Sequence, residues 1–254
     1  MRDDEGTIRG PEWWLRLNVA WWRLTIGPEY PPSPADRRDI RLFGLELPLR
    51  ASVAVFAVTA LILVDQLRLV MPAFPDAGPT GLRAITLERF VLFLVVPLAI
   101  VVVGFRDSPG RYGLRLGDWR WGVGLLVAGL VVMTPIILGL AGLEPFRAYY
   151  GSGQEPLGAA LANHLGELIP AEFLMRGFLM FALWRRIGPL ALVIVQVPFI
   201  LTHIGKPDLE LWSTFIGGTI FAWLDWRTGS ILWSALGHVY VLTLMVVAVG
   251  GVTV

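Results

Sequence analysis

Long apolar segments alternate with short charged, glycine- or proline-containing turns along most of this chain. Seven such segments cover about 50–72, 88–105, 121–142, 157–184, 188–204, 208–226 and 230–250. Because a helix needs roughly 20 largely apolar residues to cross the hydrocarbon core of a bilayer, each segment is predicted to be a transmembrane helix, although the fifth is short. The pattern predicts an all-α, polytopic membrane helix bundle, with one transmembrane domain over 50–254.

A different pattern precedes the first apolar segment. Residues 11–24 interleave tryptophan with arginine, which is typical of a helix that lies on a membrane surface with its indole rings at the level of the lipid headgroups. Residues 28–36 are rich in proline and cannot continue a helix. Residues 1–49 are therefore predicted to be a cytoplasmic region made of an interfacial helix and a proline-rich linker.

The positions of the arginines predict the orientation. Residues 1–50 contain eight arginines, and the turns after the second, fourth and sixth segments contain Arg106, Arg111, Arg115, Arg120, Arg185, Arg186 and Arg227. The opposite turns hold little more than Arg83, Arg147 and Lys206. Because basic residues accumulate on the cytoplasmic side, the N-terminus is predicted to be cytoplasmic and the C-terminus outside.

Composition agrees with a membrane protein. Hydrophobic residues make up 55% of the chain and charged residues only 16%, against about 25% charged in an ordinary soluble domain. The net charge of +1 argues against nucleic acid as a partner, and the apolar segments make the lipid bilayer the expected surroundings of the chain. The chain has no cysteine, which excludes disulfides and a thiol nucleophile.

The fourth apolar segment carries ionisable residues in its interior. Glu172 and Arg176 are four residues apart, so they share one helix face and can form an ion pair. Pro170 removes a backbone hydrogen bond and is predicted to kink the helix just before Glu172. A charge at membrane depth usually serves function and has a partner, although a buried pair can also serve helix packing alone.

A second face of this segment contains His164, Glu167 and Ala171, while two further histidines lie in the fifth and seventh segments. At about 1.5 Å per residue, Glu172, His203 and His238 are predicted to lie about 20, 23 and 16 Å from the cytoplasmic boundary. Three such groups at a common depth can converge on one site.

A carboxylate and an imidazole together can take a proton from water, and a second imidazole can stabilise an oxyanion. The chain has neither the zinc-binding helix motif of His-Glu-x-x-His nor a Gly-x-Ser-x-Gly elbow. No cofactor or metal is therefore expected, although Glu172, His203 and His238 are conceivable zinc ligands by type.

Three motifs in this region resemble those of the CPBP family of intramembrane proteases, which includes the type II CAAX prenyl endopeptidases and the Abi, bacteriocin-processing proteins. The family pattern is Glu-Glu-x-x-x-Arg, then Phe-x-x-x-His, then His-x-x-x-Asn. Here Glu172 with Arg176, Phe199 with His203, and His238 occupy the corresponding positions. The resemblance covers about 157–242, including the run Trp226–Trp233 that contains a Thr-Gly-Ser turn.

The resemblance implies an intramembrane endopeptidase that hydrolyses a membrane-proximal peptide bond in a membrane-associated peptide or protein. The expected location is a bacterial plasma membrane. Glu172 and His203 would activate water, His238 would stabilise the oxyanion, and Arg176 would orient Glu172. Two positions depart from the family pattern: Ala171 replaces the first glutamate and Leu242 replaces the asparagine.

The departures leave two questions open. Glu172 is the first candidate for the catalytic base, and Glu167, one turn before Ala171, is the alternative. The chain can also be a catalytically impaired relative that acts as an immunity protein or binds peptides or proteins. A transporter that uses the buried Glu–Arg pair as a relay is a third possibility.

Overall fold

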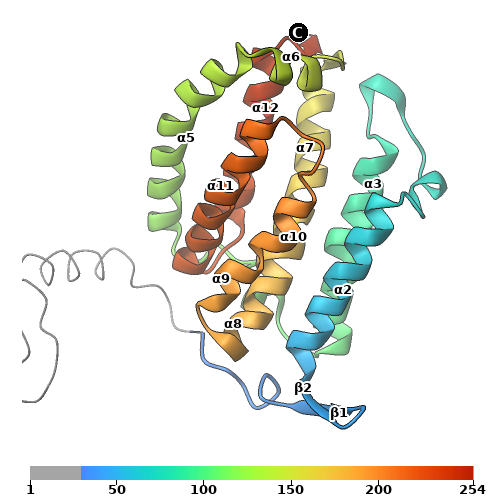
Figure 1. The fold of residues 1–254 in the computed structure, drawn as a ribbon, viewed down its shortest axis with the longest axis vertical. Coiled ribbons are helices and arrows are strands. Elements are labelled where there is room, and N and C mark those ends of the chain that lie inside the picture. Colours follow the sequence, from blue (N-terminus) through green and yellow to red (C-terminus); the bar gives the residue numbers. More distant parts are fainter. Residues whose placement is uncertain (1–29, 254) are drawn as a thin grey trace, which may run out of the picture.

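The computed structural model describes residues 30–253, and the predicted interfacial helix at 11–24 lies outside them. The described chain is a helical bundle with two very small sheets (Figure 1). In chain order its elements are β1 Asp39–Leu42, β2 Leu45–Pro48, α2 Leu49–Gln66, η1 Met71–Ala73, η2 Gly78–Thr80, α3 Ala84–Phe90, η3 Val91–Val95, α4 Val96–Ala99, η4 Ile100–Gly104, η5 Pro109–Tyr112, α5 Trp119–Ala141, α6 Glu144–Tyr150, β3 Glu155–Pro156, α7 Leu157–Glu172, η6 Phe173–Met180, α8 Phe181–Ile187, α9 Leu190–Ile194, α10 Gln196–Leu201, α11 Asp208–Thr228, α12 Leu232–Ala248 and β4 Val252–Thr253.

Each of the seven apolar segments is helical, but their lengths differ from the predicted ones. In the described part of the chain, three helices are long and apolar enough to cross a membrane: Leu49–Gln66, Ala84–Gly104 and Trp119–Ala141. Leu190–Leu201 and Leu232–Ala248 are apolar but shorter. The first segment ends at Gln66 rather than at 72 because Arg68 leaves the helical conformation with a φ of 54°. The all-helical membrane fold is thus supported, and the number of seven spans stays a prediction.

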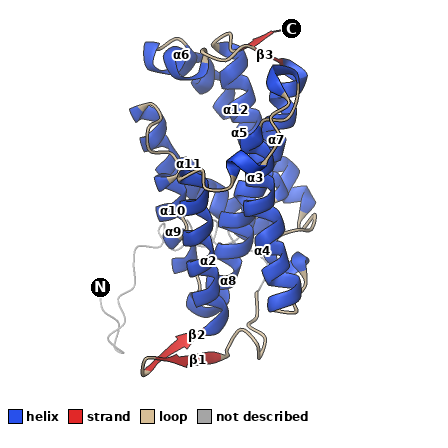
Figure 2. Cartoon of the chain, turned by 90° about the vertical axis from the view of Figure 1, so that its right-hand side faces the viewer, coloured by secondary structure: helices blue, strands red, loops and turns tan. Residues whose placement is uncertain are grey.

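The helices run side by side along the long axis of the molecule. The β1–β2 hairpin and the start of the described chain lie at one end of the bundle and the C-terminus lies at the other (Figures 1 and 2). The run from α7 through η6 to α8 is central, because α7 packs against α3 and α12 while η6 packs against α2 and α11. Helix α12 in turn packs against α5, α7 and α11.

The α-helical geometry changes at Phe173, three residues after Pro170. Residues Phe173–Met180 form a π-helix, and all eight are buried. Pro170 has no N–H to donate to the preceding turn, and π-helical segments are frequent where a regular helix is interrupted near a functional site. The structure thus changes helix type directly after Glu172, and the kink expected at Pro170 stays a prediction.

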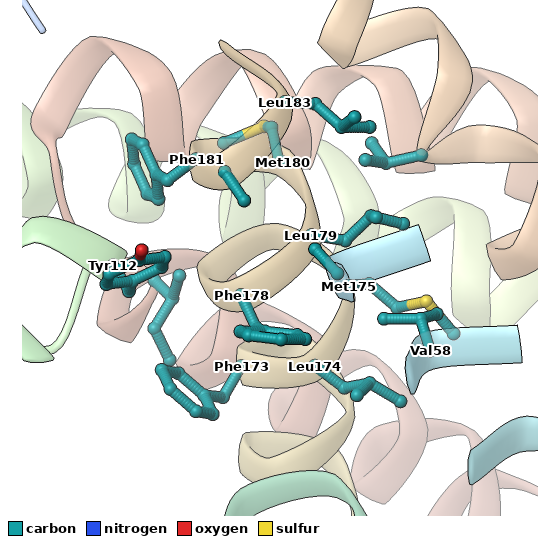
Figure 3. Packing of buried hydrophobic residues seen from close by; sticks show 14 of the residues in the cluster. Val58, Tyr112, Phe173, Leu174, Met175, Phe178, Leu179, Met180, Phe181 and Leu183 are labelled. Atoms are coloured by element: carbon teal, nitrogen blue, oxygen red, sulfur yellow. The ribbon is translucent and has the colours of Figure 1, made fainter. Parts of the chain in front are cut away.

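The π-helix is the centre of the hydrophobic core. Its side chains pack toward Tyr112 on one side and toward Val58 of α2 on the other (Figure 3). The rings of Tyr112 and Phe178 have centroids 6.3 Å apart, and Phe105 stacks on Phe178 at 6.2 Å. Gly177 allows this approach, since a Cβ there would lie 2.8 Å from the Tyr112 carbonyl oxygen.

Buried ion pairs attach the segment before α2 to the loop at 105–112. Asp36 accepts hydrogen bonds of 2.7 Å from Arg50 and from Arg111, and both arginines also bond to Asp107. Burial alone would raise the pKa of the Asp36 carboxyl, but hydrogen bonds from Ser33 and the two arginines outweigh it and hold the pKa below its ordinary value. The ionised carboxylate thus stabilises this end of the bundle.

Replacing Gly177 with alanine is expected to destabilise the fold by about 1–3 kcal/mol, because the new Cβ meets both a backbone oxygen and the Phe173 ring. Thermal unfolding of the purified protein in detergent measures the change. Gly158→Ala is the matched control on the same helical run, since nothing lies within 4 Å of a Cβ at that position. Equal unfolding temperatures for the two variants would contradict the packing described here.

Asp36→Asn is expected to lower the unfolding temperature at pH 7 and to have a smaller effect at pH 3. Because the folded-state pKa of Asp36 is lowered, its stabilisation is present above the ordinary aspartate value of about 4 and is lost as the pH falls below it. Asp39→Asn is the control, since Asp39 forms an ion pair with Arg186 that is about one-third exposed. An effect of Asp36→Asn that is the same at both pH values would contradict the assignment.

Candidate active site

Glu172 connects three helical segments at the centre of the bundle. Its side chain is completely buried at the end of α7. Oε1 accepts a hydrogen bond of 2.7 Å from His238 Nδ1 on α12, and Oε2 forms an ion pair with Arg176 on η6. The hydroxyl of Ser234 lies 3.3 Å from Oε2. Both carboxylate oxygens are therefore occupied by donors.

Arg176 is as deeply buried as its partner. Its side chain is 1% exposed, and Nη2 donates to the carbonyl oxygen of Gly218 on α11 at 3.3 Å. The guanidinium lies over the ring of Phe199, 4.2 Å from the centroid, where a cation is attracted to the π-face. The ion pair of four-residue spacing predicted from the sequence is thus present, and it also connects η6 to α10 and α11.

His203 lies just after α10 and faces the same site. Its Nδ1 is 2.8 Å from the carbonyl oxygen of Phe199. The rings of His203 and His238 are nearly parallel, with an interplanar angle of 17° and centroids 6.3 Å apart. The structure therefore brings Glu172, Arg176, His203 and His238 together, as the common depth predicted.

Hydrogen-bond chemistry fixes which imidazole nitrogen carries a proton. A carbonyl oxygen and a carboxylate only accept, so Nδ1 of His203 and Nδ1 of His238 must both be donors. The Nε2 atom of each ring has no hydrogen-bond partner among residues 30–253. About 14% of the His238 side chain is exposed while Glu172 is fully enclosed, so the imidazoles are the part of the site that meets its surroundings.

The start of α12, and with it His238, is positioned by the turn at 228–230. Gly229 adopts a φ of +70°, and its carbonyl oxygen accepts a hydrogen bond of 2.9 Å from Arg115. The carbonyl oxygen of Thr228 accepts a bond of 2.7 Å from the backbone N–H of Asp118. The side-chain oxygen of Ser230 accepts a hydrogen bond of 3.2 Å from the N–H of Leu232, the first residue of α12. The loop before α5 therefore sets where α12 begins.

Residues 153–244 match the family model described as type II CAAX prenyl endopeptidase Rce1-like. This match confirms the resemblance inferred from the motifs. The Rce1-like segment, residues 153–244, contains all four residues of the site, and the family is one of proteases. Together with the long apolar helices, the match indicates an integral membrane protein. No curated protein and no solved structure matches the chain.

Glu167 of the Rce1-like segment lies outside this site. Its Oε1 accepts hydrogen bonds from Arg83 at 2.8 Å and Thr86 at 2.9 Å, and its Oε2 accepts one from Arg89 at 2.8 Å. The carboxylate is thus directed toward α3 and bound there. The prediction that Glu167 could reach the place of the missing glutamate at Ala171 finds no support in these contacts.

His164 also belongs to a different part of the Rce1-like segment. It is buried, and its Nδ1 forms a hydrogen bond of 2.9 Å with the hydroxyl of Thr243 on α12. Ala171 is half-buried and packs against the main hydrophobic cluster. His164 therefore serves the packing of α7 against α12 and makes no hydrogen bond with the site residues.

Sequence reasoning missed Asp225 of α11 as a neighbour of the site. Its side chain is completely buried, and its Oδ2 lies 2.8 Å from the Ser234 hydroxyl that also approaches Glu172. An acidic residue within the predicted sixth span was a signal of the same kind as Glu172.

The side chains of the site are arranged for hydrogen bonds and an ion pair with one another. Over residues 30–253, no group of three or more His, Asp or Glu side chains lies in an arrangement that could hold a metal ion. Glu172 instead uses its oxygens for Arg176 and His238, and His203 uses Nδ1 for a backbone carbonyl.

The buried ion pair of Glu172 and Arg176 is expected to contribute strongly to the free energy of unfolding. Glu172→Gln and Arg176→Met are each expected to destabilise the protein by about 3–5 kcal/mol, because each leaves an unbalanced charge or polar group in the interior. The double variant removes both charges and is expected to be more stable than the sum of the single effects predicts. Unfolding in detergent measures all three variants, and strictly additive losses would show that the two side chains do not stabilise one another.

Proposed function

We propose that this protein is a membrane-embedded endopeptidase of the CAAX type, which hydrolyses a peptide bond close to the membrane surface. The observation that carries the proposal is the bond from His238 to Glu172, whose second oxygen is held by Arg176, inside a segment that matches a protease family. A histidine oriented by a buried carboxylate is the arrangement that hydrolases use to manage protons during acyl transfer.

The geometry favours a positioning role for Glu172. A general base must come within hydrogen-bond reach of the water it deprotonates, but Glu172 is fully buried and both of its oxygens already accept bonds. Its contact with His238 fixes the imidazole so that Nε2 points away from the carboxylate. We therefore assign the proton transfers to His203 and the oxyanion contact to His238, rather than a base role to Glu172, the first candidate base from the sequence.

His203 is the proposed base. Its Nδ1–H is bound to a carbonyl oxygen, which leaves the lone pair of Nε2 free to take a proton from water. The oxygen of that water attacks the peptide carbonyl carbon. In this step His238 carries a proton on both ring nitrogens, donates from Nδ1 to the Glu172 carboxylate and donates from Nε2 to the developing oxyanion. When the tetrahedral intermediate collapses, His203 returns the proton to the leaving amine, so that one water is consumed for each bond cleaved.

The proposal also includes a class of substrate and an orientation in the membrane. The substrate is a membrane-associated peptide or protein, since the site residues come from helices inside the bundle rather than from a separate soluble domain. The hairpin end of the bundle carries many of the arginines, including Arg41, Arg111 and Arg186, so the proposed cytoplasmic side is this end and the C-terminus lies outside. A bacterial plasma membrane is the proposed location.

A second candidate is a catalytically impaired relative that binds peptides or proteins at the same site. The observation that favours it is Ala171, because a methyl group packed on the core replaces the carboxylate that the family pattern places beside Glu172. Leu242 likewise lacks the amide of the family asparagine. This candidate predicts binding without the appearance of new peptide termini.

His203→Ala and His238→Ala are expected to lower the rate of peptide cleavage by about 10²–10⁴-fold, because each removes a group that handles a proton or an oxyanion. The purified protein is reconstituted into liposomes with native membrane extract, and new peptide termini are mapped by mass spectrometry. His164→Ala is the matched control, since it removes a buried histidine that does not contact the site.

The outcomes separate the two candidates. Termini that form with the unmodified protein and with His164→Ala, but not with His203→Ala, support the endopeptidase and reveal its substrate class. Identical termini from folded unmodified and His203→Ala proteins would refute the proposed protease. If the unmodified protein and His203→Ala then both bind the same peptides from the membrane extract, the peptide-binding relative is favoured.

A further inference from the structure

A continuous chain of polar contacts leads away from the site through groups that the mechanism above does not use. Asp225 near the end of α11 contacts Ser234 on the first turn of α12, and Ser234 contacts Glu172 at the end of α7. All three side chains are completely buried. This series of contacts ends at His238, because Glu172 also accepts a hydrogen bond from its Nδ1. Asp225 on α11 is thus connected to His238 on α12, the proposed oxyanion donor.

There are fewer hydrogens than acceptor oxygens around Ser234 in this series of contacts. The Ser234 hydroxyl has one hydrogen but lies near three acceptors: Asp225 Oδ2 at 2.8 Å, the Ile231 carbonyl oxygen at 3.0 Å and Glu172 Oε2 at 3.3 Å. If both carboxyl groups were ionised, two of these three oxygens would face Ser234 Oγ without a hydrogen between them. A proton on Asp225 leaves only one such oxygen, because Asp225 then donates to Ser234 and the Ser234 hydrogen can point to Glu172. The Ile231 carbonyl oxygen still accepts the backbone N–H of Ala235 at 3.0 Å.

The surroundings of the two acids decide where the proton resides. Glu172 receives donors from Arg176 and His238, which stabilise a carboxylate. Asp225 has no ion pair, and its Oδ1 lacks any hydrogen-bond partner within the described residues. An isolated ionised carboxylate in such a position is very costly, whereas a neutral carboxyl that donates one bond is not.

We infer that Asp225 is a positioning residue of the site, which retains a proton and, through the Ser234 hydroxyl, holds the Glu172–His238 pair in place. The inference rests on the proposed function for its consequence in cleavage, but the position of the proton is a property of the structure itself. Loss of the contact at Ser234 leaves Oε2 of Glu172 with Arg176 alone and frees the carboxylate to rotate toward it. The bond to His238 is then weakened.

The first arm of the test measures cleavage in the liposome assay. Asp225→Leu removes the donor and is expected to lower the rate about tenfold, as loss of one buried hydrogen bond does. Asp225→Asn keeps an amide N–H that can donate to Ser234 and is expected to restore most of the lost rate. Ser234→Ala is expected to lower the cleavage rate as much as Asp225→Leu does. The double variant Asp225→Leu/Ser234→Ala is expected to cleave no more slowly than either single variant. Equal losses with Asn and Leu would overturn the inference, because they would mean that Asp225 must ionise.

The second arm needs no activity. Infrared spectra of the full chain are expected to show the carbonyl stretch of a protonated carboxyl group that disappears in Asp225→Asn. Labelling the three histidines with ¹⁵N is expected to show a His238 Nδ1 resonance that shifts in Asp225→Leu and remains in place in Asp225→Asn. Spectra without the protonated carboxyl group, or a His238 signal that ignores Asp225→Leu, would overturn the inference.

The two arms separate this inference from the proposed function. If the unmodified protein cleaves no more than His203→Ala, the endopeptidase is refuted, and the spectra alone decide whether Asp225 holds a proton and positions His238. If cleavage occurs but the spectra and the rescue both fail, the endopeptidase stands and the role of Asp225 is refuted.

Discussion

The ion pair of Glu172 and Arg176 is the constraint on which the rest of the structure depends. Two opposite charges that are almost completely buried must stay together, since separating them leaves a bare charge among apolar side chains. Their remaining hydrogen bonds go to α11 and α12, and the Arg176 guanidinium rests on a ring of α10. The pair therefore fixes where five helical segments meet, namely α7, η6, α10, α11 and α12. This meeting point determines where the two imidazoles lie.

Much of this arrangement could be predicted from the sequence. Spacing by four residues predicted the pairing of Glu172 and Arg176, and counting residues from the membrane boundaries predicted that His203 and His238 would share their depth. Both predictions use only the regular geometry of helices. The fold class followed equally from the lengths and apolarity of the segments, whereas the number of full spans did not, because several of the helices are short or polar.

Three other features of the site depend on contacts between helices and could not be predicted from the spacing within one helix. Glu167 shares a helix face with Ala171, but three donors from α3 and the turn before it draw its carboxylate away. Asp225 joins the site only because α12 begins where the loop before α5 holds the turn at 228–230. The π-helix after Glu172 likewise depends on packing on all sides and has no signature beyond Pro170. These features come from contacts between helices, which sequence spacing does not encode.

Within residues 30–253, the three helices that are long and apolar enough to cross a bilayer all precede residue 142, while the candidate site lies in the segment 153–244. Translation therefore delivers the self-inserting half first. The later helices carry buried charges that lipid tolerates poorly, and they become stable only against protein surfaces that are already in place. The proposed catalytic groups are therefore synthesised after the helices that are most able to enter the bilayer.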